Sequence, residues 1–180
     1  MALLNTWDNF FIIVGSSAGA LIGLTFVAVT LIAGRQDQAS GPGIAAFTTP
    51  TVLQFGAVLF FAAVLSAPWQ TLSSPAFALG LAGLGGVLYT AIVIRRQRRL
   101  ESYRPVAEDW LWYVGGPLVA YVALIAGAIL LVGNPVPALF IIGGVMALLM
   151  FIGIRNAWDI VTYIVILPVT QPGGQDETKE

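Results

Sequence analysis

Residues 10–33 read FFIIVGSSAGALIGLTFVAVTLIA and contain no charged side chain. The hydrocarbon layer of a bilayer is about 30 Å thick, so a helix that rises 1.5 Å per residue needs about 20 apolar residues to cross it. This stretch is long enough and apolar enough to form a transmembrane helix. It is also longer than the apolar core of a secretory signal peptide, and no Lys or Arg precedes it. We therefore expect it to be retained as the first membrane span.

Four further apolar stretches follow along the chain. The five predicted spans cover about residues 10–33, 50–67, 76–94, 111–132 and 138–154. Of the 180 residues, 58% are hydrophobic and 9% are charged, against about 25% charged in a typical soluble domain. The mean hydropathy is +0.88. Strands are not expected, because open sheet edges cannot satisfy their hydrogen bonds in lipid. The predicted fold class is all-α, a polytopic transmembrane helical bundle in one domain over residues 1–170.

The chain after the fifth predicted span is more polar. Residues 155–167 are predicted to form an interfacial helix that continues this span. Arg155 and Asp159 stand four residues apart, so they can pair on one helical face, with Thr162 about one turn further. Residues 171–180 are rich in Gly, Gln and acidic side chains, which predicts a disordered cytoplasmic tail.

The basic residues predict the orientation of the spans. All eight lie in alternate connections, after the first, third and fifth spans: Arg35; Arg95, Arg96, Arg98, Arg99 and Arg104; Arg155 and Lys179. Connections rich in Arg and Lys stay in the cytoplasm. The pattern therefore predicts five spans with the N-terminus outside and the C-terminus in the cytoplasm.

Several kinds of chemistry are disfavoured by composition. The chain has no Cys and no His, which removes thiol nucleophiles, imidazole acid–base catalysis and metal ligation through these side chains. The predicted span interiors contain no Asp, Glu, Lys or Arg, although such residues usually mark proton relays and coupled-ion sites. We therefore predict that the protein is not an enzyme and has no catalytic residue, cofactor or metal.

Small residues form a regular pattern in the first span. Gly15, Gly19 and Gly23 are spaced four residues apart and so line one helix face. Such faces let a second helix approach closely, which drives helix association in lipid. The face is interpreted as a packing surface within one subunit or as an oligomer contact, with a pathway lining as a third alternative.

Polar side chains inside the predicted spans are few. Gln54 is the most polar, and Ser16 and Thr25 lie in the first span. An amide in lipid needs a partner, so we expect Gln54 to form an interhelical hydrogen bond or to line a pathway. The same two interpretations apply to Ser16 and Thr25.

The arginine cluster after the third span is the densest group of charges. Arg95, Arg96, Arg98, Arg99 and Arg104 are suited to the anionic headgroups of membrane lipids or to an acidic partner protein. Nucleic acid is not an expected partner, because the net charge of −1 is close to neutral and no folded cytoplasmic domain accompanies the cluster.

One family resemblance is present in the first span. The run from Gly19 to Ile32, preceded by Trp7 and Phe10, resembles the first span of small uncharacterised bacterial integral membrane proteins, some of which are loosely labelled as modulators of a membrane protease. The resemblance implies a bacterial inner membrane location. It brings no catalytic motif.

These observations order the functional hypotheses. The first is a non-catalytic integral membrane subunit that associates with itself or is accessory to a larger membrane complex. The alternative is a passive oligomeric channel or small-solute facilitator, since hydroxyls and Gln54 could line a narrow path. A membrane enzyme ranks third, because charge pairing explains the clustered ionisable residues.

Overall fold

The computed structural model describes residues 2–33, 42–97 and 111–166, and within these ranges every element is helical. The elements are α1 (Ala2–Asn5), α2 (Asp8–Ala33), α3 (Pro42–Ser66), α4 (Ser73–Gln97), the π-helical turn η1 (Leu111–Gly115), α6 (Gly116–Gly133) and α7 (Pro135–Ile166). The prediction of an all-α fold is confirmed for the described part of the chain.

Four helices are long and apolar enough to cross a membrane. They are α2, α4, η1 together with α6, and α7, and a shorter apolar segment, Pro50–Ser66, lies in α3. Their length and composition suit helices that cross a bilayer. The count of five spans and their orientation stay predictions.

Two prolines lie at different places in their helices, Pro50 in the interior of α3 and Pro117 in the first turn of α6. The helix α3 begins at Pro42, eight residues before the predicted start at 50, so Pro50 lies inside the helix. The missing N–H of a proline costs one hydrogen bond in a helix interior, which neighbouring helices make tolerable in membrane proteins. Pro117 instead lies in the first turn of α6, a position that proline favours. The predicted span 111–132 is therefore η1 followed by α6.

The last helix is longer than the predicted fifth span. A single residue, Asn134, separates α6 from α7, and its N–H donates to the Leu130 carbonyl at 2.7 Å. From there α7 runs for 32 residues without a break, which corresponds to about 48 Å. The predicted interfacial segment 155–167 is thus a direct continuation of the span as far as Ile166. The predicted tail 171–180 lies outside the described residues.

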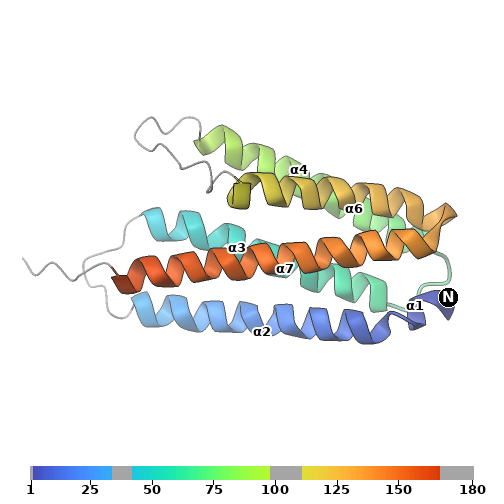
Figure 1. Ribbon diagram of the computed structural model, residues 1–180, viewed down its shortest axis with the longest axis horizontal. Helices are drawn as coiled ribbons and strands as arrows, with labels where there is room; N and C mark the ends of the chain where they lie inside the picture. Colours follow the sequence, from blue (N-terminus) through green and yellow to red (C-terminus); the bar gives the residue numbers. More distant parts are fainter. Residues whose placement is uncertain (1, 34–41, 98–110, 167–180) are drawn as a thin grey trace, which may run out of the picture.

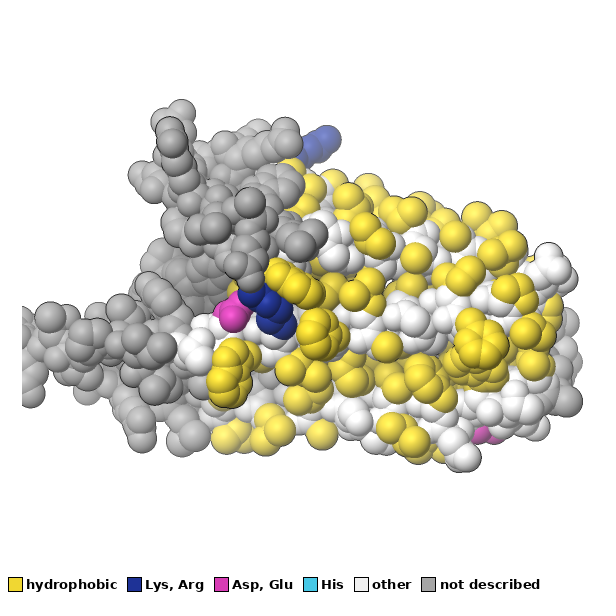
Figure 2. All heavy atoms as spheres, in the orientation of Figure 1, with side chains coloured by type: hydrophobic (Ala, Val, Ile, Leu, Met, Phe, Trp, Pro, Cys, Tyr) yellow, Lys and Arg dark blue, Asp and Glu magenta, His cyan; other side chains and the backbone are white. Residues whose placement is uncertain are grey.

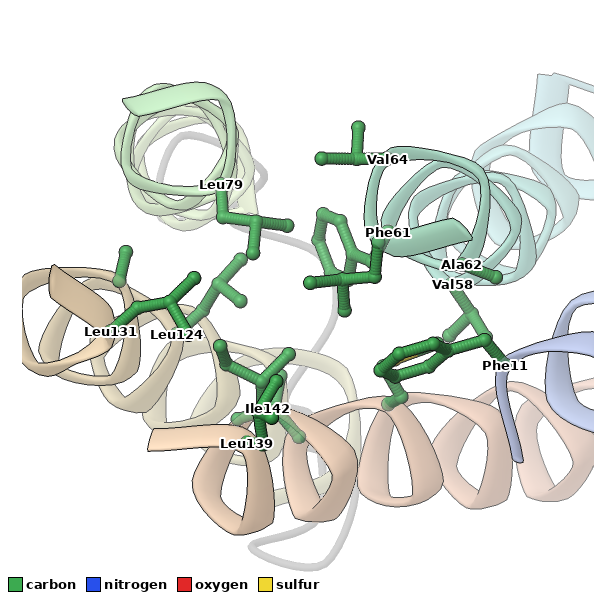
Figure 3. Packing of buried hydrophobic residues seen from close by; sticks show 14 of the residues in the cluster. Phe11, Val58, Phe61, Ala62, Val64, Leu79, Leu124, Leu131, Leu139 and Ile142 are labelled. Carbon is green, nitrogen blue, oxygen red and sulfur yellow. The ribbon is translucent and has the colours of Figure 1, made fainter. Parts of the chain in front are cut away.

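The helices form an antiparallel bundle around α7. Consecutive long helices run in opposite directions (Figure 1). On one side α7 packs on α3, which packs on α2, and on the other side it packs on α6, which packs on α4. Contacts between α3 and α4 are few. Figure 3 shows the core, where Phe61 of α3, Leu79 of α4 and Leu124 of α6 point toward one another above α7.

The two ends of the bundle differ in charge. We call the end where α3 begins and α4 and α7 terminate the arginine end (Figure 1), because Arg95 lies in the last turn of α4 and Arg155 in the C-terminal half of α7. On the face shown in Figure 2, the blue Lys and Arg side chains lie toward this end. From Ser73 to Arg95 in α4, and from Pro135 to Arg155 in α7, the rise is about 33 Å and 30 Å. Both arginines thus stand about one hydrocarbon thickness from the opposite end. This agreement supports the prediction that they share one membrane side.

Candidate functional site

The three glycines of α2 do not share one environment. Gly15 is buried, and a Cβ atom built on it would come within 2.8 Å of the Ala62 Cβ on α3. Gly15 therefore permits the close contact between α2 and α3. Gly19 and Gly23 are different, because a Cβ on either would meet no atom within 4 Å, and Gly23 is exposed.

Glycines between the other helices resemble Gly15. A Cβ on Gly127 of α6 would lie 2.9 Å from the Ile142 side chain of α7, and a Cβ on Gly153 of α7 would lie 2.5 Å from the Phe55 ring of α3. At Gly86 of α4 it would run into the Tyr121 ring of α6. Packing within the chain thus uses these glycines and leaves Gly19 and Gly23 without a neighbour among the described residues.

Four polar side chains of the described part are buried. They are Thr51, Gln54, Thr90 and Asn156, and we call this set the polar end of the core. The Phe55–Gly153 contact sets the register between the antiparallel helices α3 and α7. Gln54 of α3 and Asn156 of α7 therefore both lie on the arginine-end side of this contact.

Three amide atoms in the polar end lack hydrogen-bond partners among the described residues. Asn156 is fully buried, and neither of its side-chain polar atoms is paired with a described residue; the same holds for the Gln54 Oε1 atom. The Thr90 hydroxyl, by contrast, donates to the Gly86 carbonyl at 2.8 Å. Burying an unpaired amide costs free energy, so Gln54 and Asn156 are the core positions where packing and polarity conflict.

The predicted polar set does not form one site. Gln54 is buried, whereas Ser16 is exposed and the Thr25 hydroxyl donates to the Leu21 carbonyl of its own helix at 2.7 Å. Asn156 was missed by sequence reasoning, because the fifth span was predicted to end at residue 154. Its place directly after Arg155 in an apolar stretch was the available signal.

The pairing predicted for Arg155 and Asp159 is confirmed. The Arg155 Nη1 donates to the Asp159 Oδ2 at 2.9 Å, and the guanidinium carbon lies 4.8 Å from the centre of the Trp112 ring. The Thr162 hydroxyl lies one turn further and donates to the Trp158 carbonyl. Arg155 thus makes an ion pair and a cation–π contact, both of which are explained by helix packing.

Of the predicted arginine cluster, the structure describes only the beginning. Arg95 is exposed near the C-terminal end of α4, and Arg96 follows it in the same helix. Arg98, Arg99 and Arg104 lie outside the described residues. A lipid or partner site at this cluster stays a prediction.

A groove between α3 and α4 has a volume of about 460 Å³. We call it the α3–α4 groove. It exists because α4 packs on α6 and touches α3 at few points. Its lining is almost wholly apolar and includes Gly56, Ala57, Ala82, Gly85, Tyr89 and Tyr121. A Cβ on Gly56 or Gly85 would meet nothing within 4 Å, so these two glycines leave the groove hollow.

Among the described residues, no group of three acidic side chains could hold a metal ion. No family model, curated protein or solved structure matches the chain. The open glycines, the polar end of the core and the α3–α4 groove are the candidate functional features of the described residues.

Proposed function

We propose that this protein is a non-catalytic integral membrane subunit that associates with itself through the outer face of α2. The observation that carries the proposal is that Gly19 and Gly23, four residues apart, have no neighbour within 4 Å of a Cβ. The arginine distribution supports an N-out, C-in orientation, and the resemblance of the first span supports a bacterial inner membrane.

Open glycines matter more in lipid than in water. Lipid tails are as apolar as a helix surface, so helices associate in a bilayer through close packing rather than through the hydrophobic effect. Glycines at four-residue spacing allow two backbones to approach closely. The face formed by Gly19 and Gly23 offers this geometry to a second copy.

The position of α2 fits the same role. It packs on α3 at the edge of the bundle. Of the residues in an apolar stretch of 18 residues in α2, 11% are buried, compared with 50% in α7. Exposed side chains near the two glycines include Leu24, Phe26 and Val27. A partner helix could therefore reach the glycines without displacing another element that the structure describes.

The alternative, a passive oligomeric channel or small-solute facilitator, draws support from the polar end of the core. Water in a path would satisfy the amides of Gln54 and Asn156. The rest of the core is apolar and closely packed, with Leu79, Leu124 and Leu139 fully buried. A path inside one chain would have to cross this layer, which favours the subunit proposal.

The experiment compares matched leucine variants in lipid nanodiscs. Gly19→Leu/Gly23→Leu blocks the open face of α2, and Gly144→Leu places the same side chain at another open glycine on α7, where a Cβ also meets nothing within 4 Å. Oligomeric state is read by single-molecule photobleaching and native mass spectrometry.

We expect an oligomer for the wild type and for Gly144→Leu, and a shift to monomer for the double variant, because bulky side chains keep the backbones apart. A monomeric wild type at high protein-to-lipid ratio would overturn the proposal, as would an unchanged oligomer in the double variant. Conductance or solute flux in reconstituted bilayers would favour the alternative.

A further inference from the structure

We propose that the α3–α4 groove binds one anionic phospholipid, with an acyl chain in the groove and the phosphate beside the arginines at the end of α4. The proposal is independent of self-association, because the groove is formed within one chain. It rests on the shape of the groove, on its lining and on the charge beyond one of its ends.

The shape of the groove follows from four small residues. Gly56 and Ala57 come from α3, and Ala82 and Gly85 come from α4. Larger side chains at these positions would close the space between the two helices. The volume of about 460 Å³ lies within the range of about 300–1,000 Å³ that is common for small-molecule sites. The groove is therefore large enough for a ligand of lipid type.

The charge at one end of the groove favours a phospholipid over a helix of a second copy, because arginines follow the groove along α4. An acyl chain is a single file of methylene groups and can lie between two helices. The almost wholly apolar lining suits such a chain, which needs no hydrogen-bond partner along its length.

Charge complementarity specifies the headgroup. Tyr89 lines the groove, and α4 continues from it to the arginines at positions 95 and 96, about two helical turns and a rise of about 10 Å further on. The Arg95 side chain is exposed. Basic residues between helices at the cytoplasmic side bind anionic headgroups, with about 1 kcal/mol for each Lys or Arg near the surface, or about fivefold in affinity.

Tyr89 fits the same placement. Aromatic side chains with a polar tip are enriched at the level of the headgroups. A phospholipid with its chain along Gly85 and Gly56 would pass this level at Tyr89 and reach the arginine positions next. Along α4 the apolar groove is followed by Tyr89 and then by the arginines. This order matches the acyl chain, the glycerol backbone and the phosphate of a phospholipid.

The test measures lipid retention by native mass spectrometry. Delipidated protein is titrated with phosphatidylglycerol and, in parallel, with phosphatidylcholine that has the same acyl chains. For the wild type we expect one retained phosphatidylglycerol per chain, in preference to phosphatidylcholine. Lipid adducts are counted per chain on the monomer and oligomer peaks separately, so failure of self-association leaves the readout intact.

Three variants separate the two parts of the site. Gly85→Leu fills the groove and should lose the retained lipid, while Gly144→Leu, at an open glycine outside the groove, should keep it. Arg96→Gln should keep binding but lower the preference for phosphatidylglycerol about fivefold, the effect of one basic residue near the surface. Gly56→Leu fills the groove from α3 and replaces Gly85→Leu if that variant does not fold by circular dichroism.

Three results would overturn the proposal. One is retention of the lipid by both groove-filling variants at the wild-type level. Another is equal binding of the two lipids by the wild type. The third is that the groove-filling variants lose the oligomer and keep their lipid binding. This result would assign the groove to a second copy.

Discussion

Glycines on two sides of this bundle have opposite uses. Between α6 and its neighbours, the space beside Gly86 and Gly127 is occupied by a side chain of the adjoining helix. We call this the packed side. On α2 and along the α3–α4 groove, Gly19 and Gly85 face open space, and we call this the open side. The same residue type thus closes a contact within the chain in one region and leaves a surface for lipid or another chain in the other.

The contrast is sharpest at two consecutive residues of α4. Gly86 lies against the Tyr121 ring, whereas Gly85 lines the groove and has no neighbour within 4 Å of a Cβ. The two residues have the same backbone cost in a helix and differ only in what surrounds them. The same substitution at the two positions changes helix propensity equally, so any difference in stability comes from the surroundings.

The largest effect is expected for Gly86→Leu. The new side chain must displace the Tyr121 ring, and overpacking of this kind costs about 3 kcal/mol at the upper end of its usual range. Gly85→Leu should change the free energy of unfolding by less than about 1 kcal/mol. The measurement is sodium dodecyl sulfate-driven unfolding in mixed micelles, followed by tryptophan fluorescence.

Equal costs for the two variants would break the comparison. The groove would then be closed in the folded protein, and the phospholipid proposal would lose its cavity. A Gly86→Ala variant with wild-type stability would likewise show that Tyr121 moves aside without cost.

The sequence predicted the bounds of the helices better than the contacts that each helix face makes. The apolar length of residues 10–33 fixed the first helix to within two residues, because span length is set by bilayer thickness. Spacing alone could not distinguish Gly15 from Gly19 or Gly23, since all three share one helix face. The distinction arises because Ala62 of α3 meets only the first of them, and the crossing of two helices is a tertiary property.

The α3–α4 groove and the polar end of the core were out of reach for the same reason. Gly56 and Gly85 carry no pattern that links them, and they face a common space only because α4 packs on α6 rather than on α3. Asn156 was placed beyond a predicted span end, because Arg155 interrupts the apolar run. The charge pair of Arg155 and Asp159, by contrast, was predictable, since helical spacing alone brings residues four apart together.

An intermediate effect is expected for Asn156→Leu. This position lies on α7, fully buried, with both amide atoms unpaired among the described residues. An apolar side chain of similar size removes the cost of an unpaired buried group, which is about 1 kcal/mol or more. We therefore expect the variant to raise the free energy of unfolding by about 1 kcal/mol in the same assay.

Asn156→Ala serves as the control, because it removes the amide but leaves a cavity, which destabilises. A marked loss of stability in Asn156→Leu would show that the amide is satisfied in the membrane. The polar end of the core would then be hydrated, and the channel alternative would gain support.

The smallest effect is expected for Asp159→Asn. The Arg155 and Asp159 side chains are 26% and 40% exposed, and a pair of this kind within one helix contributes about 0.3–0.5 kcal/mol. Arg155 keeps its contact with the Trp112 ring in the variant. The difference in unfolding free energy should shrink in 0.5 M salt, since screening weakens exposed pairs. A cost of about 3 kcal/mol that is insensitive to salt would mean that the pair is desolvated. Arg155 would then lie in the hydrocarbon layer rather than at its boundary, and the predicted level of the arginine end would be wrong at α7.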